Sequence, residues 1–407
     1  MSKTKKSIRA GVYNTLCEQA ERAVGAGAKN SSLVTVLLFA VPLFALGILL
    51  FALPQKDFSE TENRTLETLR APAGLFEFAD GSFSVSFASF CQDQFPARDS
   101  LIGLHGYAEL ALLRRESNGV LLCADGYLIP HPSEQYENVE KNISGVLAYA
   151  KNHPDLSLML AVAPRSIDVM QSVLPAGYDT SAAEKAWQTL SASLAGAQID
   201  SVDLRAALQS AAQSGVQTHY RTDHHWTTRG AYEAYAALLR AQGEEPYPLS
   251  DFEEELASDA FFGTTWSKAG LHFVAPDQME YYRYANDTKF RTEIAFTDIA
   301  YEGFYDRSFL QKKDKYASFL GGNYAMTTVT QENPAAPRER LLLIKDSYAH
   351  ALAPFLARHY DLVLVDLRYY KMSLADYLAE NPVDRVLILE NMDSLLTAGT
   401  LSLLAYE

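Results

Sequence analysis

The residues "RLLLIKDSYAHALAPFLARHYDLVLVD", Arg340 to Asp366, are the best indication of the fold, because they contain two apolar strands separated by one helix. Residues 341–344 and 362–365 are short apolar runs, as expected of strands that are buried on both faces. Between them a tight turn leads to helical spacing from Tyr348 onward. A strand, a helix and a second strand in succession predict a parallel βαβ unit.

The same alternation of helix and strand continues on both sides of this stretch. A helical pattern leads to the apolar strand "LSLMLAVAP", and a later helix leads to a second short strand. The chain closes with a short helix and the strand "DRVLILEN". We therefore predict an α/β fold with a parallel sheet that is covered on both faces. An aromatic, less regular section at about 244–340 is expected to be a β-rich insertion beside the sheet.

One apolar run near the N-terminus has the length of a membrane span. The run "LVTVLLFAVPLFALGILLFAL", residues 33–53, has no charged side chain, and at 1.5 Å per residue it reaches about 31 Å. A buried core helix would have a polar face, and this run has none. A signal peptide would have a shorter apolar stretch followed by a small-residue cleavage site, which is not seen here. We therefore predict an uncleaved transmembrane helix.

The distribution of charge predicts the orientation of this helix and the domain plan. The chain has a net charge of −15, but residues 1–32 have a surplus of four positive charges, which leaves −19 on the remainder. By the positive-inside tendency, residues 1–32 are a cytoplasmic tail and the acidic remainder lies outside the cell. Residues 54–130 form a juxtamembrane connector and the start of the exported domain, and 131–407 form its main part. Such an acidic surface argues against nucleic acid as a partner.

The three cysteines leave two readings open. Cys17 falls in the predicted tail, whereas Cys91 and Cys123 fall outside, where an oxidising compartment permits a disulfide. Free buried thiols are an equal alternative, because the spacing resembles neither a zinc site nor a redox pair.

Ser347 occupies the position at which an open parallel sheet gathers its reactive groups, between a strand and the next helix. A hydroxyl at such a turn lies beside free backbone N–H groups and the positive end of a helix dipole, which suit an oxygen nucleophile. An ordinary helix N-cap at Asp346 or Ser347 is the alternative, because both residue types are favoured there.

The stretch "HYRTDHHWTTRGAYEAYAALL", His219 to Leu239, offers the base that a serine nucleophile needs. In an extended segment, Asp223 and His225 project from the same face, so that the carboxylate reaches one ring nitrogen and the other faces Ser347. His224 is then expected to point the opposite way, into a structural role.

The residues "YRTDHHWTTRGAYEAY" resemble the signature of the DHHW protein family, which is similar to the SGNH-hydrolase-like domains of alginate and other polysaccharide O-acetyltransferases. The resemblance extends over most of residues 55–400. It implies a triad in a permuted order, in which Asp223 orients, His225 is the general base and then acid, and Ser347 is the nucleophile. It also implies a membrane-anchored O-acetyltransferase or acetylesterase acting on cell-surface polysaccharide, with a membrane-bound acyl-exporting partner and no cofactor.

Four further residues are candidates for binding the oxyanion or the substrate. Asn391 follows a strand where the resemblance places a helper asparagine, although it can equally cap the next helix. Arg368 also ends a strand, and it can bind an acidic glycan or form a surface ion pair. Asn323 lies in the family-like tract "FLGGNYAM". Lys345 stands where the family has glycine, two positions before the serine.

Two other functional classes are left open by the sequence. His219, Asp223, His224 and His225 are all capable ligands for Zn²⁺ or Mn²⁺, although adjacent histidines in an extended strand would diverge from one ion. A non-catalytic glycan-binding or scaffold protein is the other alternative. It predicts that Ser347 and His225 do not contact each other.

Overall fold

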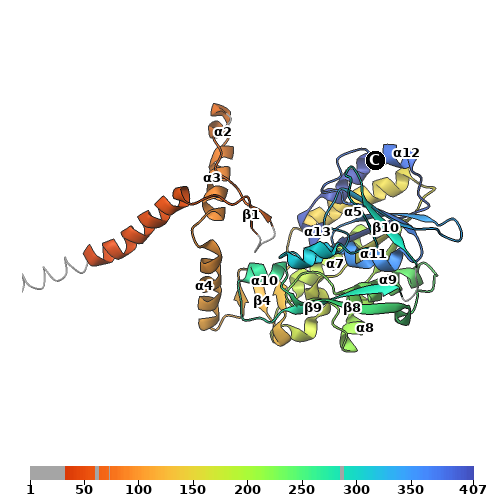
Figure 1. Ribbon diagram of the computed structural model, residues 1–407, viewed down its shortest axis with the longest axis horizontal. Coiled ribbons are helices and arrows are strands. Elements are labelled where there is room, and N and C mark those ends of the chain that lie inside the picture. Colours follow the sequence, from red (N-terminus) through yellow and green to blue (C-terminus); the bar gives the residue numbers. More distant parts are fainter. Residues whose placement is uncertain (1–32, 60–63, 73, 285–287) are drawn as a thin grey trace, which may run out of the picture. The chain divides into compact units, whose positions relative to one another are not determined.

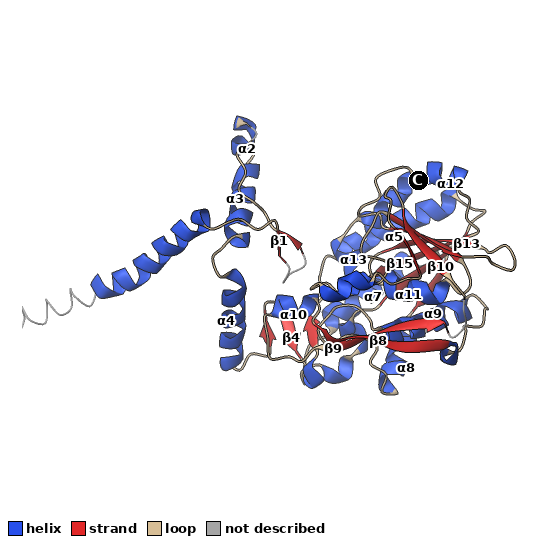
Figure 2. Cartoon of the chain, in the orientation of Figure 1, coloured by secondary structure: helices blue, strands red, loops and turns tan. Residues whose placement is uncertain are grey.

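The computed structural model describes residues 33–59, 64–72, 74–284 and 288–407, and the chain divides into two compact units near Arg98. The predicted cytoplasmic tail, including Cys17, lies outside the described residues. Figures 1 and 2 show the order of the elements along the chain. Cys91 and Cys123, one in each unit, are both free thiols.

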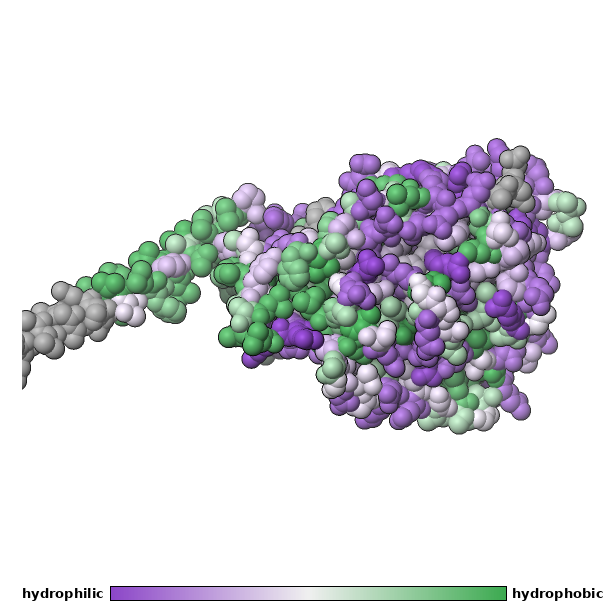
Figure 3. All heavy atoms as spheres, turned by 90° about the horizontal axis from the view of Figure 1, so that it is seen from below, coloured by the Kyte–Doolittle hydropathy of each residue, from purple (hydrophilic) through white to green (hydrophobic). Residues whose placement is uncertain are grey.

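The N-terminal unit contains one helix, Leu33–Ala52, that is long and apolar enough to cross a membrane, with a mean hydropathy of 2.8. Its side chains are exposed along almost the whole length. Most of its surface is coloured as hydrophobic in Figure 3. The remaining elements of this unit are short: β1 (Phe58–Ser59), β2 (Arg64–Thr65), α2 (Leu75–Ala79) and α3 (Ser82–Asp93).

The C-terminal unit is built on an eight-stranded sheet in the order β11-β10-β12-β14-β13-β15-β6-β7. Five neighbouring strands are parallel, which confirms the predicted α/β class: β14 (Asp361–Val365), β13 (Arg340–Lys345), β15 (Arg385–Asn391), β6 (Ser157–Ala163) and β7 (Asp200–Asp203). The remaining three are antiparallel: β12 (Met326–Gln331), β10 (Phe290–Ile294) and β11 (Ala300–Glu302).

Alternate residues of the parallel strands enter two separate cores. In β13, Leu341 and Leu343 belong to one core, whereas Leu342 and Ile344 belong to the other. The helices that cover the first core are mainly α8 (Arg205–Gln213), α9 (Thr228–Ala241) and α11 (Ala349–Leu356). The helices that cover the second core are mainly α5 (Tyr136–Asn152), α7 (Ser181–Ser193), α13 (Met392–Thr397) and η6 (Thr400–Tyr406). Both faces of the sheet are therefore buried, as predicted.

The insertion is β-rich, but it does not lie wholly beside the sheet. Its first part is a separate antiparallel pair, β8 (Phe252–Phe261) and β9 (Asp277–Tyr284), with α10 (Thr264–Ala269) between them. Its second part contributes β10, β11 and β12, which extend the main sheet beyond β14. The backbone of β12 pairs with Leu362–Val365 of β14, and this pairing extends the sheet. Without it, β14 would be an edge strand with unpaired backbone groups.

The remaining elements of the unit lie before or between the strands of the sheet. Residues 119–130 include a hairpin whose two strands are the second and third of a small antiparallel sheet, and its turn contains Asp125 and Gly126, both with positive φ. The elements are α4 (Arg98–Ala111), β3 (Glu116–Ser117), β4 (Val120–Leu122), β5 (Leu128–Pro130), α6 (Ser166–Val169) and α12 (Leu374–Glu380).

Candidate active site

Ser347 lies in the turn between β13 and α11, at the carboxyl edge of the parallel strands. Asp346 holds this turn: it is 2% exposed, and its carboxylate accepts hydrogen bonds from the N–H of Tyr348 (2.9 Å), the N–H of Asn391 (2.7 Å) and the hydroxyl of Ser394 (2.7 Å). Within the described residues, no acceptor binds the backbone N–H of Ser347. That N–H can therefore stabilise an oxyanion formed on a group bound to the serine.

Residues 219–226 form a closed loop rather than the predicted extended segment. An isolated bridge pairs His219 with Trp226, and the N–H of Tyr220 donates to the carbonyl of His225 at 3.2 Å. Directly after it, the hydroxyl of Thr227 accepts the N–H of Gly230 at 3.0 Å and caps α9. The loop is thus fixed at both ends, by its own bridge and by a capped helix.

Three side chains form a continuous hydrogen-bond relay. The hydroxyl of Ser347 lies 2.7 Å from Nε2 of His225, and Nδ1 of the same ring lies 2.5 Å from Oδ1 of Asp223. Asp223 is buried, and its Oδ2 accepts the N–H (2.8 Å) and the hydroxyl (3.0 Å) of Thr264. Burial favours the neutral acid, but His224, His225 and the Thr264 N–H outweigh it and hold the pKa of Asp223 well below its usual range.

The expectation that His224 points away from His225 is wrong. The two rings lie 3.9 Å apart between centroids and tilt by 37°, and Nδ1 of His224 is 3.6 Å from Oδ1 of Asp223. The error follows from the loop, since side chains of adjacent residues diverge only where the backbone is extended. The His224 side chain is 39% exposed. Loss of hydration and then its neighbour His225 lower the pKa of His224, so the ring is neutral near pH 7.

His219, the third histidine of the motif, takes a structural position. It is fully buried, and its ring nitrogens contact the carbonyl of Pro164 at 3.1 Å and the hydroxyl of Thr218 at 3.2 Å. Burial lowers the pKa of His219 to about 4, so it stays neutral.

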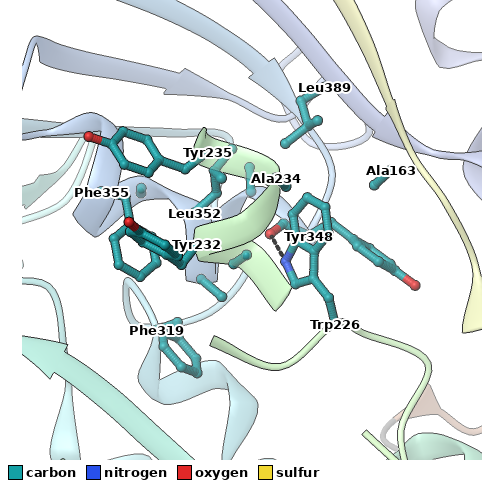
Figure 4. Packing of buried hydrophobic residues seen from close by; sticks show 14 of the residues in the cluster. Ala163, Trp226, Tyr232, Ala234, Tyr235, Phe319, Tyr348, Leu352, Phe355 and Leu389 are labelled. Atoms are coloured by element: carbon teal, nitrogen blue, oxygen red, sulfur yellow. Dashed lines mark hydrogen bonds between the residues drawn. The ribbon is translucent and has the colours of Figure 1, made fainter. Parts of the chain in front are cut away.

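Aromatic contacts bind the two halves of the site together. Tyr316 stacks on the ring of His225 at 3.8 Å and 10°, and its hydroxyl donates to the carbonyl of Ser347 at 3.3 Å. The indole N–H of Trp226 donates to the carbonyl of Tyr348 at 3.0 Å, as Figure 4 shows. The hydroxyl of Tyr348 donates in return to the carbonyl of His224. Hydrogen bonds and ring contacts therefore join the loop at residues 219–226 to the turn at Ser347, more than 120 positions away in the sequence.

Two of the four predicted helper residues are taken up by structural contacts. Asn391 caps α13, since its amide oxygen accepts the N–H of Asp393 at 2.8 Å while its amide nitrogen donates to the carbonyl of Ala163 at 3.0 Å. The structure shows the cap, and a role of Asn391 as an oxyanion donor stays a prediction. Lys345 is 3% exposed, with Nζ 2.7 Å from Nε2 of His350, and burial lowers its pKa to about 8. Lys345 is therefore buried in the protein interior beside His350.

Arg368 and Asn323 lie near each other at the surface. The guanidinium of Arg368 binds both oxygens of the buried Asp366, at 2.9 and 2.6 Å, and its side chain is 35% exposed. The amide oxygen of Asn323 lies 3.5 Å from the same guanidinium. Arg368 thus forms the ion pair that the sequence allowed, and a substrate role for either residue stays a prediction.

Three residues that hold the relay were missed by the sequence reasoning. Gly263 lies so close to Asp223 that a Cβ added to it would be 2.2 Å from the Cβ of Asp223, and Thr264 follows directly. Asp277 is buried at the start of β9 and accepts the N–H (2.8 Å) and hydroxyl (2.7 Å) of Thr222, the residue before Asp223. Nothing in their local sequence marks these residues, because each acts on a loop about 40 to 55 positions away.

Asp223, His224 and His225 also meet the distance condition for a metal site. One ligand atom from each lies within 4.8 Å of the other two. The predicted divergence of the histidines therefore does not exclude a shared ion. Nδ1 of His225 is bonded to Asp223 and Nδ1 of His224 to the hydroxyl of Thr264 (2.7 Å), so an ion at these atoms would replace those bonds.

Part of this sequence is similar to that of known proteins. The family model described as DHHW protein matches residues 205–366, which contain both the loop and Ser347. A curated relative, the probable alginate O-acetylase AlgJ of Pseudomonas syringae pv. tomato, is 28% identical over 190 residues, or 44% of this chain and 48% of the relative. The chain therefore spans about half the length of this relative.

Two solved structures share the fold. A DHHW family protein from Eubacterium siraeum superposes with a TM-score of 0.58 at 21% identity, covering 72% of this chain and 96% of that one. Bacillus cereus PatB1, solved with a sulfonyl adduct, has a TM-score of 0.53 at 19% identity, covering 68% and 97%. The resemblance to the DHHW protein family is thus confirmed over residues 205–366, and the fold is that of a solved DHHW family protein.

Proposed function

We propose that this protein is an O-acyltransferase or esterase that works through an acyl-serine on Ser347. The observation that carries the proposal is the unbroken relay from the Asp223 carboxylate through His225 to the Ser347 hydroxyl, at 2.5 and 2.7 Å. A scaffold protein would have no need for such a relay, and the contact between Ser347 and His225 is the one that a scaffold role predicts to be absent.

In the first half of the proposed reaction, Oγ of Ser347 bonds to the carbonyl carbon of an acyl ester while its proton passes to Nε2 of His225. The N–H of Ser347 is the nearest candidate donor to the resulting oxyanion. When the tetrahedral species collapses, the bond to the leaving oxygen breaks and His225 returns the proton to that oxygen. Acyl-Ser347 remains.

In the second half, an acceptor hydroxyl attacks the acyl carbon and gives its proton to His225. The bond from the acyl carbon to Oγ then breaks, and Oγ takes the proton back. With a sugar hydroxyl the result is transfer, and with water it is hydrolysis. Asp223 stays ionised throughout and keeps the Nδ1 proton of His225 on its own side, which leaves Nε2 as the base.

Two observations support a role in polysaccharide acetylation at a membrane. The named relative is a probable alginate O-acetylase, and its likeness covers part of both chains. The helix Leu33–Ala52 can anchor the protein, with the acidic C-terminal unit outside the cell. An anchored domain would receive acyl groups from a membrane-bound exporting partner and pass them to cell-surface polysaccharide.

The test uses the full chain in detergent with 4-nitrophenyl acetate. We expect a burst of nitrophenolate and a 42 Da adduct on Ser347, and a sulfonyl fluoride should block both. Ser347→Ala should abolish the burst and reduce turnover by at least about 10³-fold, as for other serine nucleophiles. Ser166, a buried serine at the start of α6, offers the control, and Ser166→Ala should keep the burst. Normal turnover in Ser347→Ala would refute the proposal.

A metal-dependent hydrolase is the second candidate, and the approach of Asp223, His224 and His225 to within 4.8 Å favours it. Neutral imidazoles and a carboxylate are suitable ligands for Zn²⁺. This reaction would require an added divalent ion and would form no adduct on Ser347.

A further inference from the structure

His224 has a defined tautomer that leaves one nitrogen free. The hydroxyl of Thr264 donates its single proton to the ionised Asp223 carboxylate at 3.0 Å, because a carboxylate can only accept. The contact of 2.7 Å between that hydroxyl and Nδ1 of His224 therefore requires the ring to donate from Nδ1. In the neutral ring, Nε2 then carries a lone pair, and no partner for it is found in the described part of the chain.

His225 has the same tautomer for the same reason. It donates from Nδ1 to Asp223 and accepts the Ser347 hydroxyl at Nε2. Both Nδ1 atoms lie on the Asp223 side, at 2.5 and 3.6 Å from one carboxylate oxygen, and the ring centroids are 3.9 Å apart. In each ring Nε2 lies on the side away from its Nδ1, and in His225 that side meets the Ser347 hydroxyl. The two rings are neighbours beside one carboxylate, and the proposed reaction uses the Nε2 atom of His225 alone.

We infer that His224 binds a second hydroxyl of the acyl acceptor, adjacent to the hydroxyl that attacks, so that the site selects vicinal diols. The inference rests on the function proposed above. An attacking hydroxyl has one proton, which goes to His225, so it has none to give to His224. A hydroxyl on the neighbouring carbon has its own proton and donates it to Nε2 of His224. The His224 side chain is partly exposed, at 39%, so an acceptor can reach it from solvent.

The experiment compares small acceptors that compete for acetyl-Ser347. Ethylene glycol has the second hydroxyl, 1-propanol replaces it with a methyl group, and 2-methoxyethanol caps it. The acetyl esters formed are quantified by gas chromatography after acylation with 4-nitrophenyl acetate. We expect the wild type to favour ethylene glycol about 10-fold, the effect of one well-placed hydrogen bond, after correction for its two equivalent hydroxyls.

Two substitutions at His224 separate binding from structure. In His224→Asn the amide can still donate to Thr264 but nothing replaces Nε2, so we expect the ratio of ethylene glycol ester to propyl ester to fall to that of free competition, whatever the rate of the burst. In His224→Gln the longer side chain can bring its amide oxygen near the position of Nε2, so we expect part of the preference to return.

The outcomes distinguish the inference from the proposed function. No acetyl adduct on Ser347 of the wild type would refute the proposed function. An adduct without any preference for ethylene glycol in the wild type would overturn the inference alone, whether or not the variants fold. An unchanged preference in His224→Asn would also overturn it.

Discussion

Replacing Gly263 by alanine should displace the Asp223 carboxylate while leaving the fold intact. The added Cβ would lie 2.2 Å from the Cβ of Asp223 and 2.3 Å from its Oδ2, far inside van der Waals contact. Gly263 has φ of −85°, which any residue adopts, so the backbone itself tolerates alanine. The whole effect must therefore fall on the packing against Asp223.

The magnitude follows from these contacts. Overpacking of this kind costs about 1–3 kcal/mol of stability, and the reduced freedom of the unfolded chain returns about 0.4–1 kcal/mol. The net loss is therefore modest. Catalysis should suffer more, because a serine–histidine pair without a correctly placed carboxylate loses up to about 10⁴-fold in turnover. We expect Gly263→Ala to lower the rate of acylation by about 10²–10⁴-fold.

The assay measures the nitrophenolate burst rate together with the thermal unfolding midpoint. Gly399→Ala is the matched control, because Gly399 has φ of −101° and its added Cβ would meet nothing closer than 3.9 Å. That variant should acylate at the wild-type rate. Wild-type acylation by Gly263→Ala, with an unchanged circular dichroism spectrum, would refute the view that the position of Asp223 controls His225.

The other predictions concern a buried acid and a metal. Burial raises the pKa of Glu390 to about 8, so between about pH 4.3 and pH 8 the unfolded chain loses a proton that the folded protein keeps, and stability falls as pH rises. Glu390→Gln should therefore raise the unfolding midpoint at pH 8 more than at pH 5, and an equal shift at both pH values in thermal melts would contradict this. Chelation with EDTA should leave the Ser347 burst unchanged, whereas loss of activity that Zn²⁺ or Mn²⁺ restores would favour the metal site of Asp223, His224 and His225.

Local patterns in the sequence were sufficient for the class of the fold. The apolar strands at residues 157–163 and 385–391 and the helices between them follow from periodicity, since each pattern repeats within a few residues. The strand, turn and helix around Ser347 were predicted in the same way. The pairing of β12 with β14 was not predicted, because a local sequence pattern does not show which strands lie next to each other in a sheet.

The chemical groups available to this protein can be read from its residues: an apolar N-terminal helix, a serine at a strand end, and an aspartate two positions before a histidine. How those groups meet depends on the folding of distant segments onto one another. In the folded chain the ring of His224 lies against that of His225, Asn391 caps α13, and Gly263 packs against Asp223. The physical reason is distance along the chain. Helical and strand periodicity act between near neighbours, whereas these contacts depend on backbone turns and packing between segments that lie far apart in sequence.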